Sequence, residues 1–224
     1  MQFGSCLPRL LQNIWETNLK EGPVLISKWD ILDAFHRCHI CSEDVGAFTY
    51  VVPPIPSDPK PLLCIDLVLP MGWVNPLDLF CVTSEIVTDQ ANIAFCSDST
   101  PQLPYYLPTA GLYEAFIAQP AGPSRLQYAD IYMNDINCLT QGDQIQQRRL
   151  TEIVLQSLKA TYPVVKGELK DSIGLKKATA GDGDWEVSKV ILGWIINTSK
   201  GTISLSPKRL SDLSQLLDIS PTQQ

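Results

Sequence analysis

Short runs of apolar or alternating residues along the chain predict a series of β-strands. Five such runs are found, at residues 23–30, 48–52, 62–69, 190–196 and 201–205. A stiff proline-rich connection, residues 53–61, separates the second run from the third. The runs are short and are not separated by regularly spaced helices, which favours an antiparallel sheet.

Helical periodicity appears in three longer segments. The strongest is 144–160, where the apolar side chains share one face of the predicted helix. Those side chains are Ile145, Leu150, Ile153, Val154 and Leu158. Further helices are expected at 76–94, with Pro76 in the first turn, and at 207–217, while 14–19 is only a weak helical fragment. Mixed helices and strands predict an α+β fold.

Residues 97–125 contain five prolines and few charges, and show no clear period. We expect a long surface insertion or a lid there.

An alternating stretch at 128–139 is interrupted by Asn134 and Asp135, two residues that favour turns. It predicts two short strands joined by a tight hairpin, with these two residues at or beside its tip. Acidic side chains on a rigid hairpin tip can hold a divalent metal close to a phosphate. The simpler alternative is an ordinary surface turn.

Composition narrows the class of protein. The 224 residues are 45% apolar and 18% charged, as in an ordinary globular protein. Seven scattered cysteines suggest reduced thiols, and the N-terminus does not resemble a signal peptide, so we expect an intracellular, non-secreted protein. The longest apolar run, 62–74, is too short to cross a bilayer and contains Asp66, so no membrane partner is expected.

The net charge of −7 arises entirely in the first half of the chain. Residues 1–112 hold 5 basic and 12 acidic residues, whereas residues 113–224 hold 12 of each. This balance argues against strong nonspecific binding of nucleic acid by the whole surface. It leaves room for a local basic track, for example Arg148-Arg149, Lys176-Lys177 and Lys208-Arg209.

Three motifs occur in a fixed order. They are Trp29-Asp30-Ile31-Leu32-Asp33-Ala34-Phe35, Leu69-Pro70-Met71-Gly72-Trp73-Val74-Asn75-Pro76 and Tyr132-Met133-Asn134-Asp135. Together they resemble the reverse transcriptases of retroviruses and long-terminal-repeat retrotransposons, in particular gypsy-like elements. The segments Leu175-Lys176-Lys177 and Ile191-Leu192-Gly193-Trp194 are similar to those that follow the catalytic hairpin in that family. The resemblance covers roughly residues 22–217.

The resemblance implies a right-hand polymerase fold, with palm and fingers around an antiparallel sheet and an incomplete thumb. Residues 1–22 would be a remnant of the N-terminal fingers, 23–200 the fingers and palm (fingers about 36–68), and 201–224 the start of a connection toward the thumb. It implies an RNA-directed DNA polymerase whose partners are an RNA or DNA template-primer, deoxynucleoside triphosphates and other domains of a pol polyprotein. A fragment of this kind would leave apolar surface uncovered, so poor solubility is expected.

The resemblance also implies a two-metal site, in which two Mg²⁺ (or Mn²⁺) ions about 3.5–4 Å apart clamp the attacking and leaving oxygens. It assigns the catalytic role to Asp30, Asn134, Asp135 and Lys177, the last one assisting the pyrophosphate. It assigns metal contacts to Asp30, the Ile31 carbonyl, Asn134 and Asp135. It assigns the nucleotide site to Asp33, Ala34, Phe35, Met71 and Gly72, with Phe35 excluding a 2′-hydroxyl. It assigns primer and template contacts to Tyr132, Met133, Leu192, Gly193 and Trp194.

Asn134 departs from the family pattern, which has aspartate at this position. An amide offers one carbonyl oxygen and no charge, so it cannot bridge two metal ions as a carboxylate does. The second ion should therefore bind poorly, and we expect the polymerase activity to be strongly reduced or absent. The alternative is a catalytically dead retroelement remnant that at most binds nucleic acid or a protein.

Other interpretations of single motifs stay open. Asp30 and Asp33 could be a helix N-cap and a solvated acid, and Phe35 could serve core packing. The run His36-Arg37-Cys38-His39-Ile40-Cys41 suggests zinc, although no second ligand pair lies at finger spacing. In an extended chain His36 and Cys38 would face one way. The run Gly181-Asp182-Gly183-Asp184 suggests calcium, but a turn is the simpler interpretation.

Overall fold

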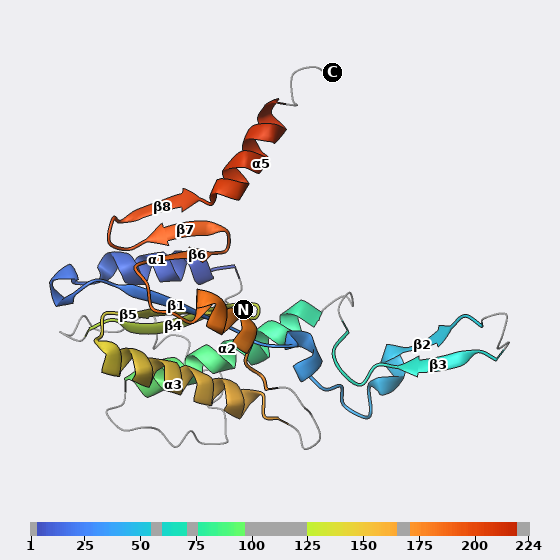
Figure 1. The fold of residues 1–224 in the computed structure, drawn as a ribbon. Coiled ribbons are helices and arrows are strands. Elements are labelled where there is room, and N and C mark those ends of the chain that lie inside the picture. The colour runs from blue at the N-terminus through green and yellow to red at the C-terminus, as the bar shows by residue number, and fades with distance from the viewer. Residues whose placement is uncertain (1–3, 55–59, 71–75, 97–124, 165–170, 219–224) are drawn as a thin grey trace.

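A three-stranded antiparallel sheet forms the centre of the molecule. The computed structural model describes residues 4–54, 60–70, 76–96, 125–164 and 171–218. Within them, β1 (Leu25–Asp30) pairs with β5 (Asp135–Thr140), and β5 pairs with β4 (Gln127–Tyr132), in the order β1-β5-β4. The predicted hairpin is confirmed as β4 and β5, and the fold is α+β with antiparallel sheets. Figure 1 shows helices on both sides of this sheet.

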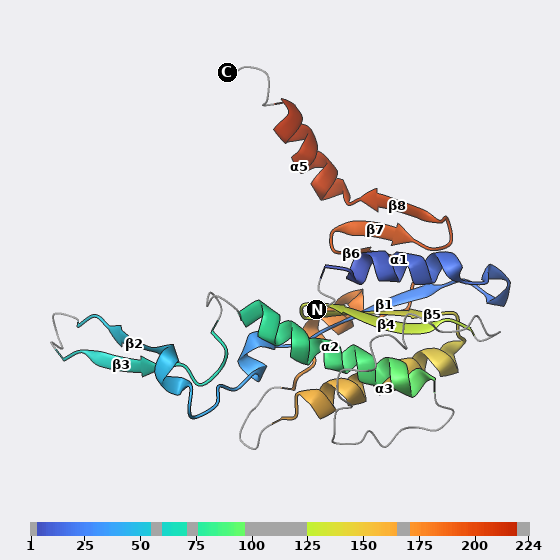
Figure 2. The same cartoon turned by 180° about the vertical axis from the view of Figure 1, so that it is seen from behind.

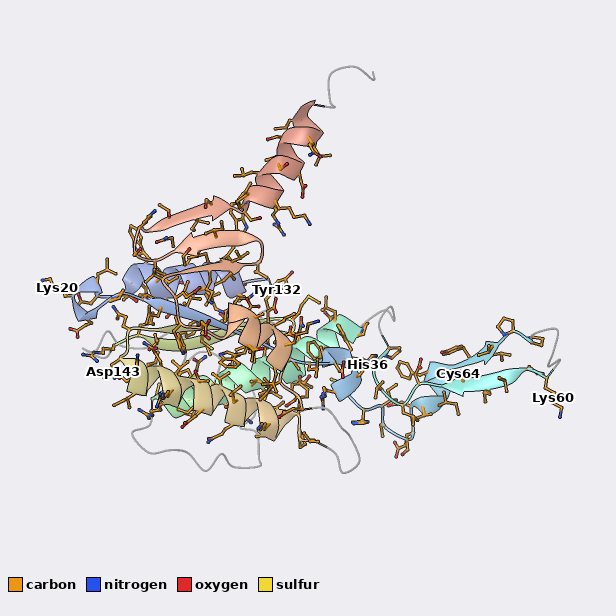
Figure 3. The ribbon with its side chains drawn as sticks, viewed as in Figure 1. Lys20, His36, Lys60, Cys64, Tyr132 and Asp143 are labelled. Atoms are coloured by element: carbon orange, nitrogen blue, oxygen red, sulfur yellow. The ribbon has the colours of Figure 1, made fainter. Side chains whose placement is uncertain are left out.

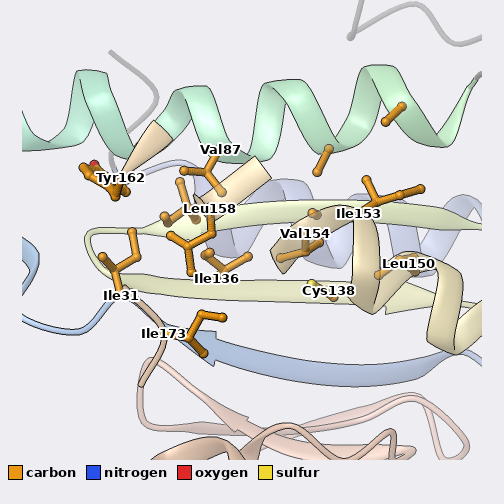
Figure 4. Close-up of a cluster of buried hydrophobic side chains, with 14 of the residues drawn as sticks. Ile31, Val87, Ile136, Cys138, Leu150, Ile153, Val154, Leu158, Tyr162 and Ile173 are labelled. Carbon is orange, nitrogen blue, oxygen red and sulfur yellow. The ribbon is translucent and has the colours of Figure 1, made fainter. Parts of the chain in front are cut away.

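Two long helices cover one face of the sheet. They are α2 (Pro76–Phe95) and α3 (Gln144–Thr161), which confirm the predicted helices at 76–94 and 144–160. The buried apolar side chains of both helices pack on those of the strands, and Figure 4 shows this main core. Ile145, expected on the apolar face of α3, is instead 77% exposed. A capping box at Asp143 and Gln146 starts α3. Asn92 of α2 exchanges two hydrogen bonds with the Ala129 backbone, at 2.8 and 2.9 Å, and so covers part of the β4 edge.

The opposite face is covered by α1 (Cys6–Glu16) and by a second sheet of β6 (Ser188–Ile191), β7 (Trp194–Asn197) and β8 (Thr202–Leu205). A smaller core of buried apolar residues lies between these layers. Arg9 of α1 donates to both carboxylate oxygens of Asp130 on β4, with Nε 2.7 Å from Oδ2. This half-buried pair fixes α1 over the sheet.

Two elements project from this body. One is the hairpin of β2 (Thr49–Val52) and β3 (Leu62–Ile65), which we call the β2–β3 arm, and the other is α5 (Pro207–Asp218). Figures 1 and 2 show both pointing away from the central sheet. In Figure 3 His36 lies between the body and the arm, which carries Cys64 and Lys60. Several apolar side chains of the arm are exposed, among them Val51, Leu62 and Leu63.

Three sequence predictions need correction. The helix expected at 14–19 is α1, which begins at Cys6 and ends at Glu16. Pro8 is tolerated in its first turn, because the first N–H groups of a helix have no hydrogen-bond partner within it. The single strand expected at 190–196 is the β6–β7 hairpin, which turns at Leu192 and Gly193 with φ values of 51° and 82°. The strand expected at 62–69 stops at Ile65.

The predicted surface insertion at 97–125 lies outside the described residues except for Arg125. Among the helices that are described, none combines the length and the apolar character needed to span a bilayer.

Candidate functional site

Asp30 and Asp135 lie directly opposite each other where β1 meets β5. They are the last cross-strand pair of the register, 105 positions apart in the sequence. The next cross-strand pair, Ile31 and Asn134, is hydrogen-bonded, because the Ile31 N–H donates to the Asn134 carbonyl oxygen at 2.9 Å. Since hydrogen-bonded and non-bonded pairs alternate, Asp30 and Asp135 form a non-bonded pair, with Cα atoms about 4.5 Å apart and side chains on one face. The structure therefore brings these two carboxylates together.

The Asp30 carboxylate holds two donors on one oxygen. Its Oδ1 accepts from Asn134 Nδ2 at 2.8 Å and from Lys177 Nζ at 2.6 Å. Asp30 is buried, with a residue exposure of 9%, so these donors replace most of its solvent. The amide of Asn134 directs its NH₂ group toward Asp30, because a carboxylate can only accept.

The backbone around Gly174 explains how Lys177 reaches the sheet. Residues 172–174 extend alongside the end of β1, with Leu32 N–H bonded to the Ser172 carbonyl at 2.9 Å and Gly174 N–H bonded to the Asp30 carbonyl at 2.8 Å. The short helix α4 (Leu175–Lys177) starts directly after this segment. Lys177 is thereby held within reach of Asp30.

Gly174 also sets the space around Asp30. A Cβ atom at Gly174 would lie 2.7 Å from Asp30 Oδ2 and 3.1 Å from the Asp30 carbonyl oxygen. No side chain fits there without displacing the carboxylate. Sequence reasoning missed this residue, because its φ of −73° is ordinary and only the tertiary contact requires glycine.

Charged side chains of both signs lie around Asp135 at this end of the sheet: Lys28, Lys177, Asp30 and Asp182. Burial raises the pKa of Asp135, and Lys28 and Lys177 oppose that rise. The hydrogen bond to Asp30 raises the pKa of Lys177. Lys28 Nζ lies 3.7 Å from Asp182 Oδ2. Sequence reasoning missed Lys28, although it shares a face of β1 with Asp30 by simple alternation, and considered Asp182 only as part of a possible calcium loop.

The segment 181–184 is a turn, as expected. Gly181 has φ of 112°, and Asp184 N–H bonds to the Gly181 carbonyl at 3.2 Å. The turn brings Asp182 to Lys28.

The tip of the β4–β5 hairpin is a two-residue turn of Met133 and Asn134. Met133 has a φ of 57°, in the left-handed region that is unfavourable for a non-glycine residue. Tyr132, labelled in Figure 3 at this end of the sheet, packs against the smaller core together with Leu192. The residues expected to contact primer and template thus come from two hairpins that share one apolar cluster.

The β6–β7 turn lies against α5. At Gly193 a Cβ atom would lie 2.1 Å from Cζ of Arg209, so the guanidinium group covers this turn directly. The next residue, Trp194, is 36% exposed.

The expected nucleotide site is described only in part. Asp33 is exposed with φ of 56°, and it precedes a 3₁₀ turn that contains Ala34 and Phe35. The Phe35 ring lies 4.8 Å from the ring of Phe80 and packs on the main core, so core packing is at least one of its roles. Met71 and Gly72 lie outside the described residues.

The His36–Cys41 run does not form an extended chain. Residues 34–37 make a 3₁₀ turn, so the alternating orientation that an extended chain would give His36 and Cys38 does not apply. Cys38 Sγ lies 3.6 Å from Thr83 Oγ1 of α2, and burial raises the pKa of its thiol. His36, His39 and Cys41 are exposed.

The donor set at the hairpin tip suits one divalent cation better than two. Asp30 and Asp135 supply hard carboxylate oxygens from adjacent strands, and the Ile31 carbonyl belongs to the same end of β1. Asn134, for which the resemblance implies a third carboxylate, has its NH₂ group bonded to Asp30. No group of three or more His, Cys, Asp or Glu side chains that could hold a metal ion gathers among the residues that the structure describes, so a single divalent cation here would take its remaining ligands from backbone oxygens and water.

A comparison of the sequence with protein-family models and with curated proteins finds no match.

Proposed function

We propose that this chain is a reverse-transcriptase-like domain, an RNA-directed DNA polymerase in which Asn134 impairs two-metal nucleotidyl transfer. One observation carries the proposal: Asp30 and Asp135 are direct cross-strand partners at the tip of a hairpin. The three motifs of the resemblance support it, because two of them supply this pair. In this proposal the central sheet with α2 and α3 is the palm, the β2–β3 arm belongs to the fingers, and β8 and α5 begin the connection toward the thumb.

The proposed roles follow from chemistry. A bound divalent cation would activate the primer 3′-oxygen and neutralise charge on the phosphates. Asp30 and Asp135 would hold that cation, and Lys177 would offer a positive charge to the departing pyrophosphate. Tyr132, Leu192 and Gly193 would position the primer, and Asp33 and Phe35 would lie beside the incoming nucleotide. With an amide at 134 the cluster has two carboxylates rather than three.

The test is primer extension on a homopolymeric template, in Mg²⁺ and in Mn²⁺, with deoxynucleoside triphosphates. Wild-type protein is compared with Asn134→Asp and with the double variant Asn134→Asp/Asp135→Asn. The proposal expects Asn134→Asp to gain activity at least tenfold over wild type, and the double variant to lose that gain. Equal extension by all three proteins would refute it.

A second candidate function, a non-catalytic module that binds nucleic acid or a protein, is favoured by a separate observation. The ammonium group of Lys177 and the amide of Asn134 already satisfy Asp30, so the buried carboxylate is neutralised by the chain's own residues. The discriminating measurement is fluorescence anisotropy of a labelled primer-template in EDTA. Tight binding without any extension by Asn134→Asp would favour this candidate.

A further inference from the structure

One oxygen of the Asp30 carboxylate is engaged by two donors, and the other lies against the backbone at Gly174. Oδ1 accepts the Lys177 ammonium group at 2.6 Å and the Asn134 amide at 2.8 Å, while Oδ2 faces Gly174 so closely that a methyl group would not fit. A divalent cation that approaches Asp135 therefore meets an Asp30 carboxylate whose Oδ1 already holds the ammonium group of Lys177.

We infer that Lys177 is an internal counter-cation that occupies the place of the divalent metal on Asp30, so that metal binding requires Lys177 to swing out. This inference deepens the proposed function and rests on its metal site. It reassigns Lys177 from a residue that only assists the leaving group to one that controls access of the cation to the carboxylate pair.

The ammonium group is the donor that excludes a cation. Two positive charges compete for one carboxylate, and each repels the other at short range. The Asn134 amide is neutral and can rotate about its side-chain bonds, so it does not repel a cation in this way. The ammonium group of Lys28 is paired with a different carboxylate, since its Nζ lies 3.7 Å from Asp182 Oδ2.

Lys177 is also able to leave. Its side chain is 55% exposed, whereas that of Asp30 is 11% exposed. It belongs to a three-residue helix and projects from the edge of the site, so rotation of its side chain returns the ammonium group to water without moving the sheet. Asp30 by contrast is fixed by its strand and by the Gly174 backbone.

The experiment measures binding of Mn²⁺ alone, by electron paramagnetic resonance of the free ion, without nucleotide. Lys177→Met should bind Mn²⁺ about fivefold more tightly than wild type, because a partly exposed ion pair contributes up to about 1 kcal/mol that the metal no longer has to displace. Lys177→Arg, which keeps the charge, should bind as weakly as wild type. Lys176→Met, on the same helix, is the matched control and should not differ from wild type.

The Mn²⁺ titrations distinguish failure of the inference about Lys177 from failure of the metal site. Equal Mn²⁺ affinity for Lys177→Met and wild type, with binding abolished by Asp135→Asn, would overturn the inference while leaving the metal site intact. Absence of binding in every variant, including Asn134→Asp, would overturn both the inference and the proposed function. If Lys177→Met does not fold, Lys177→Gln removes the same charge and keeps a hydrogen-bond donor, so it takes the same place in the comparison.

Discussion

Asn134→Asp should destabilise the protein when no divalent cation is present. The substitution removes the amide donor that Asp30 Oδ1 accepts at 2.8 Å and places a third negative charge beside Asp30 and Asp135. A hydrogen bond to a charged acceptor contributes about 1.5–3 kcal/mol. Two carboxylates that relax to about 5 Å repel by about 3 kcal/mol at an effective dielectric constant near 20, and Lys177 offsets part of this.

The expected net loss is about 3 kcal/mol, which for a chain of this size lowers Tm by about 6–12 °C. Magnesium should restore part of it in the variant, since binding at ten times Kd adds about 1.4 kcal/mol. The assay is thermal unfolding followed by circular dichroism, in EDTA and in about 10 mM MgCl₂. Wild type should change little between the two buffers.

Asn134→Ala is the matched control. It loses the hydrogen bond without adding charge, so it should cost less than Asn134→Asp in EDTA and should gain nothing from magnesium. The reasoning fails if Asn134→Asp melts together with wild type in EDTA, or if magnesium raises the Tm of both proteins equally.

Three further predictions concern other parts of the fold. Gly174→Ala should lower stability by about 1–3 kcal/mol, because the added methyl group meets Asp30 at 2.7 Å; an unchanged Tm would contradict the packing. Burial raises the pKa of Asp89 to about 6, so its ionisation costs stability as pH rises from about 4 to about 6. Asp89→Asn should therefore raise the free energy of unfolding by about 1 kcal/mol at pH 7, a figure reduced to allow for the partial exposure of this side chain. It should have no stabilising effect at pH 4, and urea titrations at both pH values measure the difference. In the proposed function, Arg209→Ala should weaken the salt dependence of primer-template binding by about one phosphate contact, as fluorescence anisotropy at several salt concentrations would measure. Lys208→Ala, at the neighbouring position in the first turn of α5, should change it less, because the guanidinium group of Arg209 is the one that lies against Gly193.

Local patterns were sufficient to predict the elements that hold the two aspartates. Alternation on both sides of Asn134 predicts the β4–β5 hairpin, and the apolar run before Asp30 predicts β1, because both signals depend on neighbouring residues alone. The strand predicted at 190–196 missed the β6–β7 turn, although Gly193, with φ of 82°, is a local turn signal; Leu192, with φ of 51°, is a residue type that turns of this kind rarely use.

The contacts around Asp30 depend on residues that are distant in sequence. Lys177 reaches Asp30 because the segment at Gly174 pairs with the end of β1. The sequence near position 174 contains no pattern that predicts this pairing. Lys28 and Asp182 likewise form an ion pair between residues that are distant in sequence. The residue types at 181–184 predict a turn, but they do not predict that this turn lies beside β1. The pair of carboxylates could thus be expected from the motifs, whereas their lysine counter-charges required the tertiary structure.

The β2–β3 arm has consequences for how the molecule opens. Its two strands pair only with each other among the described strands, and the two segments that connect the arm to the body, residues 38–40 and 67–69, are hydrogen-bonded to each other. A two-stranded ribbon with exposed apolar side chains is marginally stable by itself. Its amides should exchange with deuterium long before those of β1 and β5, so the arm can unfold and refold as a separate unit while the strands bearing the carboxylates stay protected.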